Sequence, residues 1–170
     1  MELSLPNIHF RVDELRGLPR PLKYTIVTSS AEGRAELTAF DLCLLKAGVG
    51  NVNLLKVSSI LPPSAIYCEE VEPLEPGSLL PIAYGSKTSS NPGELMAAAV
   101  GIGIHSEDGY GVIMEYAGLC SEREAEEKVE SMIIEAFENR GLSLKRLMIK
   151  GIEHRVLNIG AVFAAVPLWY

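Results

Sequence analysis

The chain has 170 residues, of which 48% are hydrophobic, and its formal net charge is −7. This length suits a single domain with a sizeable core, which we expect over residues 1–170. The acidic balance argues against a nucleic-acid partner, because a nucleic-acid-binding surface normally shows a basic patch. No apolar run approaches the roughly 20 residues of a membrane span and the N-terminus lacks the pattern of a secretory signal, so we expect a cytoplasmic protein with no membrane partner.

The first half of the chain is predicted to alternate between strands and one helix. A loosely structured arm of about twenty residues leads into a strand over 24–28. A helix follows over 37–47, where apolar residues share one face and Gly48 provides a stop. Further strands are predicted over 52–57, 65–71, 79–84, 95–104 and 111–116. The 95–104 segment is ambiguous, because its run of alanines is also compatible with a helix.

The clearest helix is predicted over 122–140. Ser121 and Glu124 have the spacing of a capping box, apolar residues follow at helical intervals, and Gly141 ends the segment. Two strands, over 144–156 and 160–169, complete the chain. Two amphipathic helices among many strands predict an α+β fold in which helices cover the faces of sheets.

Cysteines and histidines indicate neither a disulfide framework nor a metal site. They are widely spaced along the chain: Cys43, Cys68, Cys120, His9, His105 and His154. The odd number of cysteines fits no set of paired disulfides, and the histidines share no ligand spacing. We therefore expect buried thiols, histidines at the surface or paired within strands, and no bound metal.

The most distinctive segment is AGVGNVNLLKVSSILPP, residues 47–63. Ser58 and Ser59 follow an apolar strand and precede Pro62 and Pro63, which cannot continue a ladder of backbone hydrogen bonds. A serine at a sharp exit from a strand can turn its hydroxyl onto the preceding carbonyl group and cut the chain. The alternative is an ordinary turn at the end of a strand, which is what an isolated Ser-Ser pair indicates.

The glycine-rich run before this strand, residues 48–53, has two interpretations. It imitates the start of a dinucleotide-binding motif, but it lacks the third glycine and precedes a strand where that motif opens a helix. Its amide side chains can instead donate hydrogen bonds to an oxyanion that forms during attack. For Asn53, a simple turn amide is the alternative.

Several separated blocks resemble the pyruvoyl-dependent arginine decarboxylases. In order, they are GVGNVNLLKVSSILPP (48–63), PGSLLPIAYG (76–85), PGE (92–94), GVIMEYAG (111–118) and AVFAAVPLWY (161–170). The resemblance extends from about Ser29 to Tyr170. It implies a four-layer α/β/β/α sandwich, self-cleaved into two chains and assembled as a homotrimer with active sites between neighbouring protomers.

The resemblance also implies the cofactor and the reaction. Ser59 attacks the carbonyl of Ser58, the resulting ester is eliminated, and hydrolysis leaves a covalent pyruvoyl group at position 59. The products are a β chain of residues 1–58 and an α chain of residues 59–170, and Asn53 assists the cleavage. The pyruvoyl group then forms a Schiff base with L-arginine and accepts electrons as CO2 leaves, which yields agmatine.

Further residues match positions that have roles in the family. Glu115 occupies the general-acid position, and burial by its apolar neighbours is expected to raise its pKa. A strand carboxylate that faces solvent or pairs with a base is the alternative. Backbone at Gly50 and Val52, together with Ile60, is expected to shape the substrate pocket.

Asp41 matches the carboxylate that binds the guanidinium group of the substrate, where two parallel hydrogen bonds select arginine. A capping-box-like pair of Thr38 with Asp41 at the start of the helix is the alternative. The next residues, Leu42-Cys43, depart from the smaller residues usual in the family, so the wall of the pocket differs. Two other functions are kept beside arginine decarboxylation: the same chemistry on another amino acid, and an unprocessed homologue that acts as a binding or assembly protein.

Overall fold

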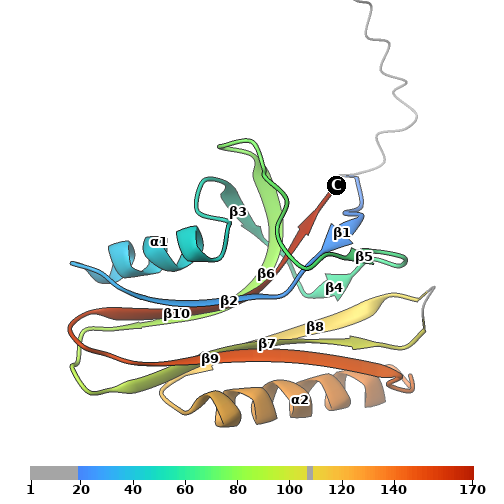
Figure 1. Ribbon diagram of the computed structural model, residues 1–170. Coiled ribbons are helices and arrows are strands. Elements are labelled where there is room, and N and C mark those ends of the chain that lie inside the picture. The colour runs from blue at the N-terminus through green and yellow to red at the C-terminus, as the bar shows by residue number, and fades with distance from the viewer. Residues whose placement is uncertain (1–18, 107–108) are drawn as a thin grey trace, which may run out of the picture.

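The computed structural model describes residues 19–106 and 109–170, which form two sheets and two helices (Figure 1). The predicted N-terminal arm lies almost wholly outside the described residues, as does His9. The helices are α1 (Glu36–Lys46) and α2 (Glu122–Glu138). The strands are β1 (Lys23–Tyr24), β2 (Val27–Glu32), β3 (Asn53–Lys56), β4 (Ile60–Leu61), β5 (Ile66–Tyr67), β6 (Leu79–Ser89), β7 (Leu95–Ile104), β8 (Gly111–Gly118), β9 (Arg146–Arg155) and β10 (Gly160–Trp169).

The strands form one six-stranded and one four-stranded sheet. The first has the order β3-β6-β10-β1-β5, with β2 also paired to β10, and the second has the order β4-β8-β7-β9. The two sheets face each other, with α1 on the outer side of the first and α2 on the outer side of the second (Figure 1). This α+β arrangement is compatible with the expected four-layer sandwich.

Strands β7 and β10 are apolar throughout because both of their faces are covered. Along β10, Val162, Ala164 and Val166 point into the core between the sheets, and the alternate residues Phe163 and Ala165 point into the core beneath α1. The alternation is that of any strand, in which successive side chains point to opposite faces. Residues 95–104 follow the same pattern between the other sheet and α2, so this ambiguous segment is a strand.

The capping pattern predicted for α2 is confirmed, and the one considered for α1 is wrong. Glu124 Oε2 accepts a hydrogen bond of 2.8 Å from the backbone N–H of Ser121, which caps the helix. In α1 the residue at the cap is Ala35, and its backbone N–H donates to Thr38 Oγ1 over 3.0 Å. Thr38 is therefore already inside the helix, and no capping pair with Asp41 forms.

Two predicted strands differ from those observed. The strand predicted over 24–28 is divided between β1 and β2, and the one predicted over 65–71 is only the two residues of β5. β5 pairs with β1 alone, in parallel, and β1 is itself two residues long. A strand of this sheet can extend only as far as its partner, so the pairing limits β5 to Ile66–Tyr67. Within the described residues, no helix has the length and apolar character needed to cross a membrane.

Candidate active site

Ser58 and Ser59 lie where the chain passes from one sheet to the other. β3 ends at Lys56 in the six-stranded sheet, and β4 begins at Ile60 in the four-stranded sheet. The backbone N–H of Ile113, in β8, donates to the carbonyl oxygen of Ser59 over 2.8 Å. The peptide bond expected to break therefore lies in a short crossover between the sheets. The residue after that bond is held by a hydrogen bond from β8.

The backbone of Ser59 is in the left-handed region, with φ = 57°. This conformation is uncommon for a residue with a Cβ atom because it is strained. Such strain persists only where surrounding contacts hold the backbone, and it is often found at functional sites. Before the crossover, the backbone N–H of Val57 donates to the carbonyl of Ile82 over 3.1 Å. Bonds on both sides thus hold Ser59 in a sharp turn, as the sequence led us to expect at the exit from a strand.

Glu115 contacts the side chain of Ser59. The hydroxyl of Ser59 donates to Glu115 Oε2 over 3.2 Å. Glu115 lies in β8 between Ile113 and Ala117, both of which pack in the core between the sheets, and its side chain is 18% exposed. Burial raises the pKa of Glu115, and the charge of Lys56 and the hydrogen bond from Ser59 offset part of that rise. The direction agrees with the expectation for a general acid.

Lys56 is a member of this cluster that sequence reasoning missed. Its Nζ atom lies 3.8 Å from Glu115 Oε1 and donates to the carbonyl oxygen of Tyr84 over 2.9 Å. It also lies over the ring of Tyr84, 4.6 Å from the ring centroid. In the sequence, Lys56 stands out as the one charged residue in the apolar run before the two serines. The sequence pattern does not indicate which residues it contacts.

Asp41 lies apart from this cluster. It is exposed on α1, beside a cavity of ≈ 490 Å³ lined by Glu32, Gly33, Arg34, Thr38, Asp41, Leu42 and Asn158. None of these residues belongs to the cluster around Ser59. In Figure 1, α1 lies toward one end of the sandwich and β4 toward the other.

Gly50 and Val52 lie near the end of α1. A Cβ atom added at Gly50 would be 2.8 Å from the Cα atom of Leu45, so the backbone passes very close to the helix there. Leu45 is one helical turn beyond Asp41, on the same face. Val52 packs, partly buried, against the core beneath α1. Asp41 and Gly50 therefore lie along one flank of the molecule.

Asn53, expected to assist cleavage, is on the same side as these residues. Its exposed side-chain amide donates to the carbonyl of Gly77 over 2.9 Å. It begins β3, whose three steps to Lys56 cover about 10 Å, before the crossover even starts. The predicted site residues thus lie in two groups on one chain, which we name after the roles expected of most of their members. The catalytic group is Ser58, Ser59, Ile60 and Glu115, together with Lys56. The binding group is Asp41, Gly50 and Val52, and Asn53, which is expected to assist cleavage, lies with it.

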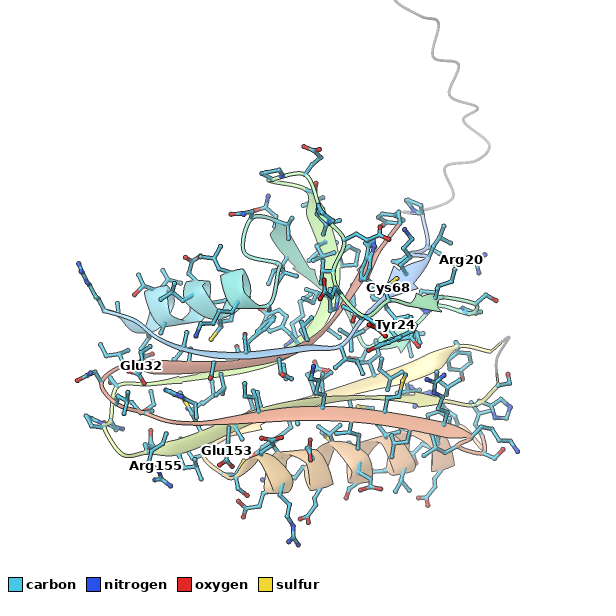
Figure 2. The ribbon with its side chains drawn as sticks, in the orientation of Figure 1. Arg20, Tyr24, Glu32, Cys68, Glu153 and Arg155 are labelled. Carbon is cyan, nitrogen blue, oxygen red and sulfur yellow. The ribbon has the colours of Figure 1, made fainter. Side chains whose placement is uncertain are left out.

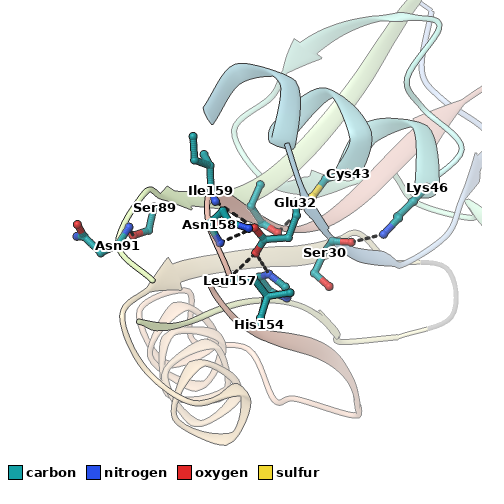
Figure 3. Close-up of polar contacts among 11 residues, drawn as sticks. Ser30, Glu32, Cys43, Lys46, Ser89, Asn91, His154, Leu157, Asn158 and Ile159 are labelled. Carbon is teal, nitrogen blue, oxygen red and sulfur yellow. Dashed lines mark hydrogen bonds and ion pairs between the residues drawn. The ribbon is translucent and has the colours of Figure 1, made fainter. Parts of the chain in front are cut away.

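A different polar cluster joins the two sheets at one end of the sandwich (Figures 2 and 3). Glu32, the last residue of β2, accepts hydrogen bonds of 2.9–3.0 Å from the backbone N–H groups of Leu157, Asn158 and Ile159. It also pairs with Nε2 of His154, in β9, at 2.5 Å. Burial alone would raise the pKa of Glu32, but these partners outweigh it and lower the pKa to about 2. His154 therefore serves a structural contact, as expected.

The remaining candidates for ligands are dispersed. All three cysteines are free thiols; Cys43 is buried as expected, and the expectation of burial is wrong for Cys68 and Cys120, which are partly exposed. His105 contacts the carbonyl oxygen of Ser143 through Nδ1 at 2.9 Å. In the part of the chain that the structure describes, no three His, Cys, Asp or Glu side chains are arranged to hold a metal ion.

The family model and the similar proteins found by comparison all point to the same family. The family model described as pyruvoyl-dependent arginine decarboxylase matches residues 23–164. A protein of that name from Methanocaldococcus jannaschii is 45% identical over 154 residues, which cover 88% of this chain and 91% of the relative. Proteins of the same name from Methanococcus aeolicus and Thermococcus kodakarensis are 43% and 39% identical, and the matches cover 88% of this chain and 91% and 96% of the relatives. The chain, with its Ser-Ser crossover and partly buried glutamate, belongs to the pyruvoyl-dependent arginine decarboxylase family.

Proposed function

We propose that this protein cuts itself between Ser58 and Ser59 and decarboxylates L-arginine to agmatine with a pyruvoyl group made from Ser59. The observation that carries the proposal is the geometry of Ser59, which is held in a left-handed turn between the two sheets with its hydroxyl 3.2 Å from Glu115. The names of the family and of its members supply the cofactor and the substrate.

Self-cleavage needs only groups that this chain carries. The Oγ atom of Ser59 bonds to the carbonyl carbon of Ser58 and displaces the nitrogen of Ser59, which leaves an ester and a free amine. Loss of the α-proton of residue 59 then breaks its Cβ–O bond, so that Ser58 departs as a carboxylate and residue 59 becomes dehydroalanine. Water replaces the nitrogen, ammonia leaves, and the α chain begins with a pyruvoyl group.

The surroundings of residue 59 fit such a group. The hydrogen bond from Ile113 is made to the carbonyl oxygen of residue 59, an atom that cleavage leaves in place, so β8 would hold the new N-terminus. When present, the pyruvoyl ketone condenses with the α-amine of the substrate and draws in the electrons released as CO2 departs. Glu115 lies at this position and, with its raised pKa, would hold a proton and deliver it to the former α-carbon.

Substrate recognition is proposed to need a neighbouring subunit. Asp41 would pair with the guanidinium group, with backbone at Gly50 and Val52 beside it, yet these residues and Ser59 are in separate groups on one chain. Contact between the binding group of one chain and the catalytic group of the next, including Ile60, would complete the site. Such a contact joins two different surfaces, and repeating it generates a ring when its rotation closes after a whole number of subunits; in the proposed trimer it closes after three.

Exposed apolar side chains support an interface at both groups. Leu45 adjoins Gly50, Leu55 and Leu79 lie on β3 and β6, and Ile60 follows the serines; all four are exposed. Contiguous exposed apolar surface commonly marks a protein–protein contact. Asn53, the first residue of β3, lies beside these exposed side chains, and we propose that it assists cleavage from there. The single domain, the absence of a metal and the cytoplasmic location stay predictions.

Intact-mass spectrometry of the purified protein tests the proposal. We expect two chains, residues 1–58 and 59–170, the second carrying a carbonyl group that borohydride reduces, and agmatine after incubation with arginine. Ser59→Ala should stay uncut. Ser58→Ala is the matched control and should still be cut, because position 58 contributes its carbonyl and not its hydroxyl.

Two results would reverse these conclusions. A chain that stays continuous after prolonged incubation, with an unaltered residue 59, would favour an unprocessed binding or assembly protein. Equal turnover of lysine or ornithine would favour the same chemistry on another amino acid.

A further inference from the structure

The side chain of Lys56 is 55% exposed, yet its ammonium group has several specific contacts. Its ammonium group is fixed by two features of Tyr84, the carbonyl oxygen at 2.9 Å and the face of the ring at 4.6 Å. From that position it reaches Glu115, at 3.8 Å. A lysine with one weak surface partner would move freely, whereas this one has three partners that agree on its position.

These contacts connect the two sheets at the candidate catalytic centre. Lys56 is the last residue of β3 and Tyr84 belongs to β6, both in the six-stranded sheet, and Glu115 belongs to β8 in the other sheet. Glu115 has Ser59 on Oε2 and Lys56 on Oε1, so each carboxyl oxygen has its own partner. The hydrogen bond from Ser59 and the ion pair with Lys56 therefore both favour this orientation of the carboxyl group.

Lys56 is the charged group that faces Glu115 among the described residues. From β9, Lys150 is in register with Val100 of β7, and Val100 is in register with Glu115, so Lys150 lies a whole strand further away. From α2, Lys128 bonds to the hydroxyl of Tyr116, the next residue, whose side chain points to the opposite face of β8. Ser59 contributes a neutral hydroxyl group, and the Tyr84 side chain packs with Phe40 and Phe163 in the core beneath α1.

We propose that Lys56 is the positioning residue of Glu115: it holds the carboxyl group beside residue 59 and sets the pH range in which that group can act as the acid. The inference rests on the proposed decarboxylation and deepens it. A general acid must lose its proton to the product and regain it before the next turnover, and it does both best when its pKa is near the working pH. Burial pushes the pKa of Glu115 up, and Lys56 limits the rise.

Lys56→Met tests this inference, since methionine keeps much of the length of the side chain and removes its charge. We expect kcat for arginine to fall roughly tenfold, with a much smaller change in KM, because one supporting contact of an acid is lost. The alkaline limb of the pH profile should move to higher pH, because the pKa of Glu115 rises without the positive charge. Lys56→Arg should restore the wild-type profile, and Lys150→Met, an exposed lysine on β9, is the matched control.

A second measurement needs neither the cofactor nor turnover. In the Ser59→Ala background, which cannot be cut, the carboxyl carbon of Glu115 can be titrated by ¹³C NMR in glutamate-labelled protein and assigned by its loss in Glu115→Gln. Adding Lys56→Met should move this titration to higher pH, and adding Lys150→Met should not. A Glu115 titration that Lys56→Met leaves in place would overturn the inference.

The two proposals fail in different ways. If the wild-type protein is not cut, or is cut and releases no CO2 from arginine, the proposed function is wrong. If the wild-type protein is active and Lys56→Met has the pH profile of Lys150→Met, the proposed function stands and the role of Lys56 is wrong. A loss of kcat in Lys56→Met that Lys56→Arg does not restore, with an unmoved pH profile, would also reject it, because lost packing alone has that effect.

Discussion

Asp41 and Glu115 carry the same functional group in opposite surroundings. Glu115 lies on the face of β8 that points between the sheets, next to a hydroxyl and an ammonium group, and burial raises its pKa. Asp41 is exposed on α1 at the rim of a cavity. A buried carboxyl group can hold and release a proton, and an exposed one is suited to pairing with a guanidinium group. Their surroundings thus suit the two carboxyl groups to the different roles proposed for them, proton transfer for Glu115 and recognition for Asp41.

Asp41→Asn should therefore weaken binding and leave maturation intact. We expect KM for arginine to rise roughly 10- to 100-fold, because hydrogen bonds between charged groups are lost and neutral ones are weaker. Initial rates against arginine concentration measure the change, and denaturing gels show whether the chain is still cut. Glu36→Gln, which removes a carboxylate from the same helix, is the control. An unaltered KM in Asp41→Asn would remove it from the site.

Strand β7 and helix α2 approach each other closely because β7 has glycines where the helix crosses it. A Cβ atom at Gly101 would lie 2.7 Å from Val129 Cγ1 and 2.8 Å from Ile133 Cδ1, and one at Gly103 would lie 2.6 Å from Ile133 Cγ2 and from Phe137 Cε2. These distances are much shorter than an ordinary van der Waals contact between carbon atoms, so a side chain at either position would clash with the helix. The two glycines thus give α2 its seat on the four-stranded sheet, whose other face carries Glu115.

Gly101→Ala should overpack this contact and lower the free energy of unfolding by about 1–3 kcal/mol. In an Ile133→Val background, which removes the Cδ1 atom, the same substitution should cost less. Urea denaturation of the four proteins of this cycle, compared at equal slope, gives the coupling between the two positions. Equal costs in both backgrounds would mean that the strand moves away from the helix as a whole.

The two sheets are joined at one end by Glu32 and His154, which come from opposite sheets (Figure 3). The same carboxylate also accepts three backbone N–H groups of the turn between β9 and β10. This turn connects the four-stranded sheet to the six-stranded sheet. One side chain therefore fixes both the spacing of the sheets and the path of the chain between them.

Glu32→Gln should lower the free energy of unfolding at neutral pH by about 1.5–3 kcal/mol, because hydrogen bonds to a charged group are lost. The pKa of Glu32 is lowered from 4.5 to about 2, so its contribution is fully present above pH 4.5 and is lost as the pH falls toward 2. Denaturation curves between pH 7 and pH 2 should therefore converge for the two proteins. Glu127→Gln, in an exposed pair with Arg123, should cost much less. Parallel curves for Glu32→Gln and the wild type down to pH 2 would contradict the role of this carboxylate.

Features determined by neighbours in the sequence were predictable. Helix α2 has its capping box and its apolar face in the sequence itself, and both are observed. The segment predicted as a strand over 65–71 failed because the length of β5 depends on β1, which lies more than 40 residues away. Strand pairing is set by tertiary context, which a local pattern does not contain.

The same limit applies to the candidate site: its local motif was predictable from the sequence, but the contacts between distant residues were not. The serines are conspicuous in the sequence, but Ser59 and Glu115 are 56 residues apart, and only the resemblance to a family connected them before the structure did. Lys56 was missed because its partners, Tyr84 and Glu115, come from two other strands in two different sheets. The separation of Asp41 from Ser59 is likewise a property of the folded chain.

The position of the Ser58–Ser59 crossover determines what would hold the molecule together after the proposed cleavage of the peptide bond. The break falls between ladders, so no strand is interrupted. The N-terminal fragment keeps β2 and β3, which pair with β10 and β6 of the C-terminal fragment, so strands of the two fragments interleave within one sheet. The fragments cannot part without dismantling that sheet, and processing would leave a nicked but undivided particle whose two new chain ends stay side by side.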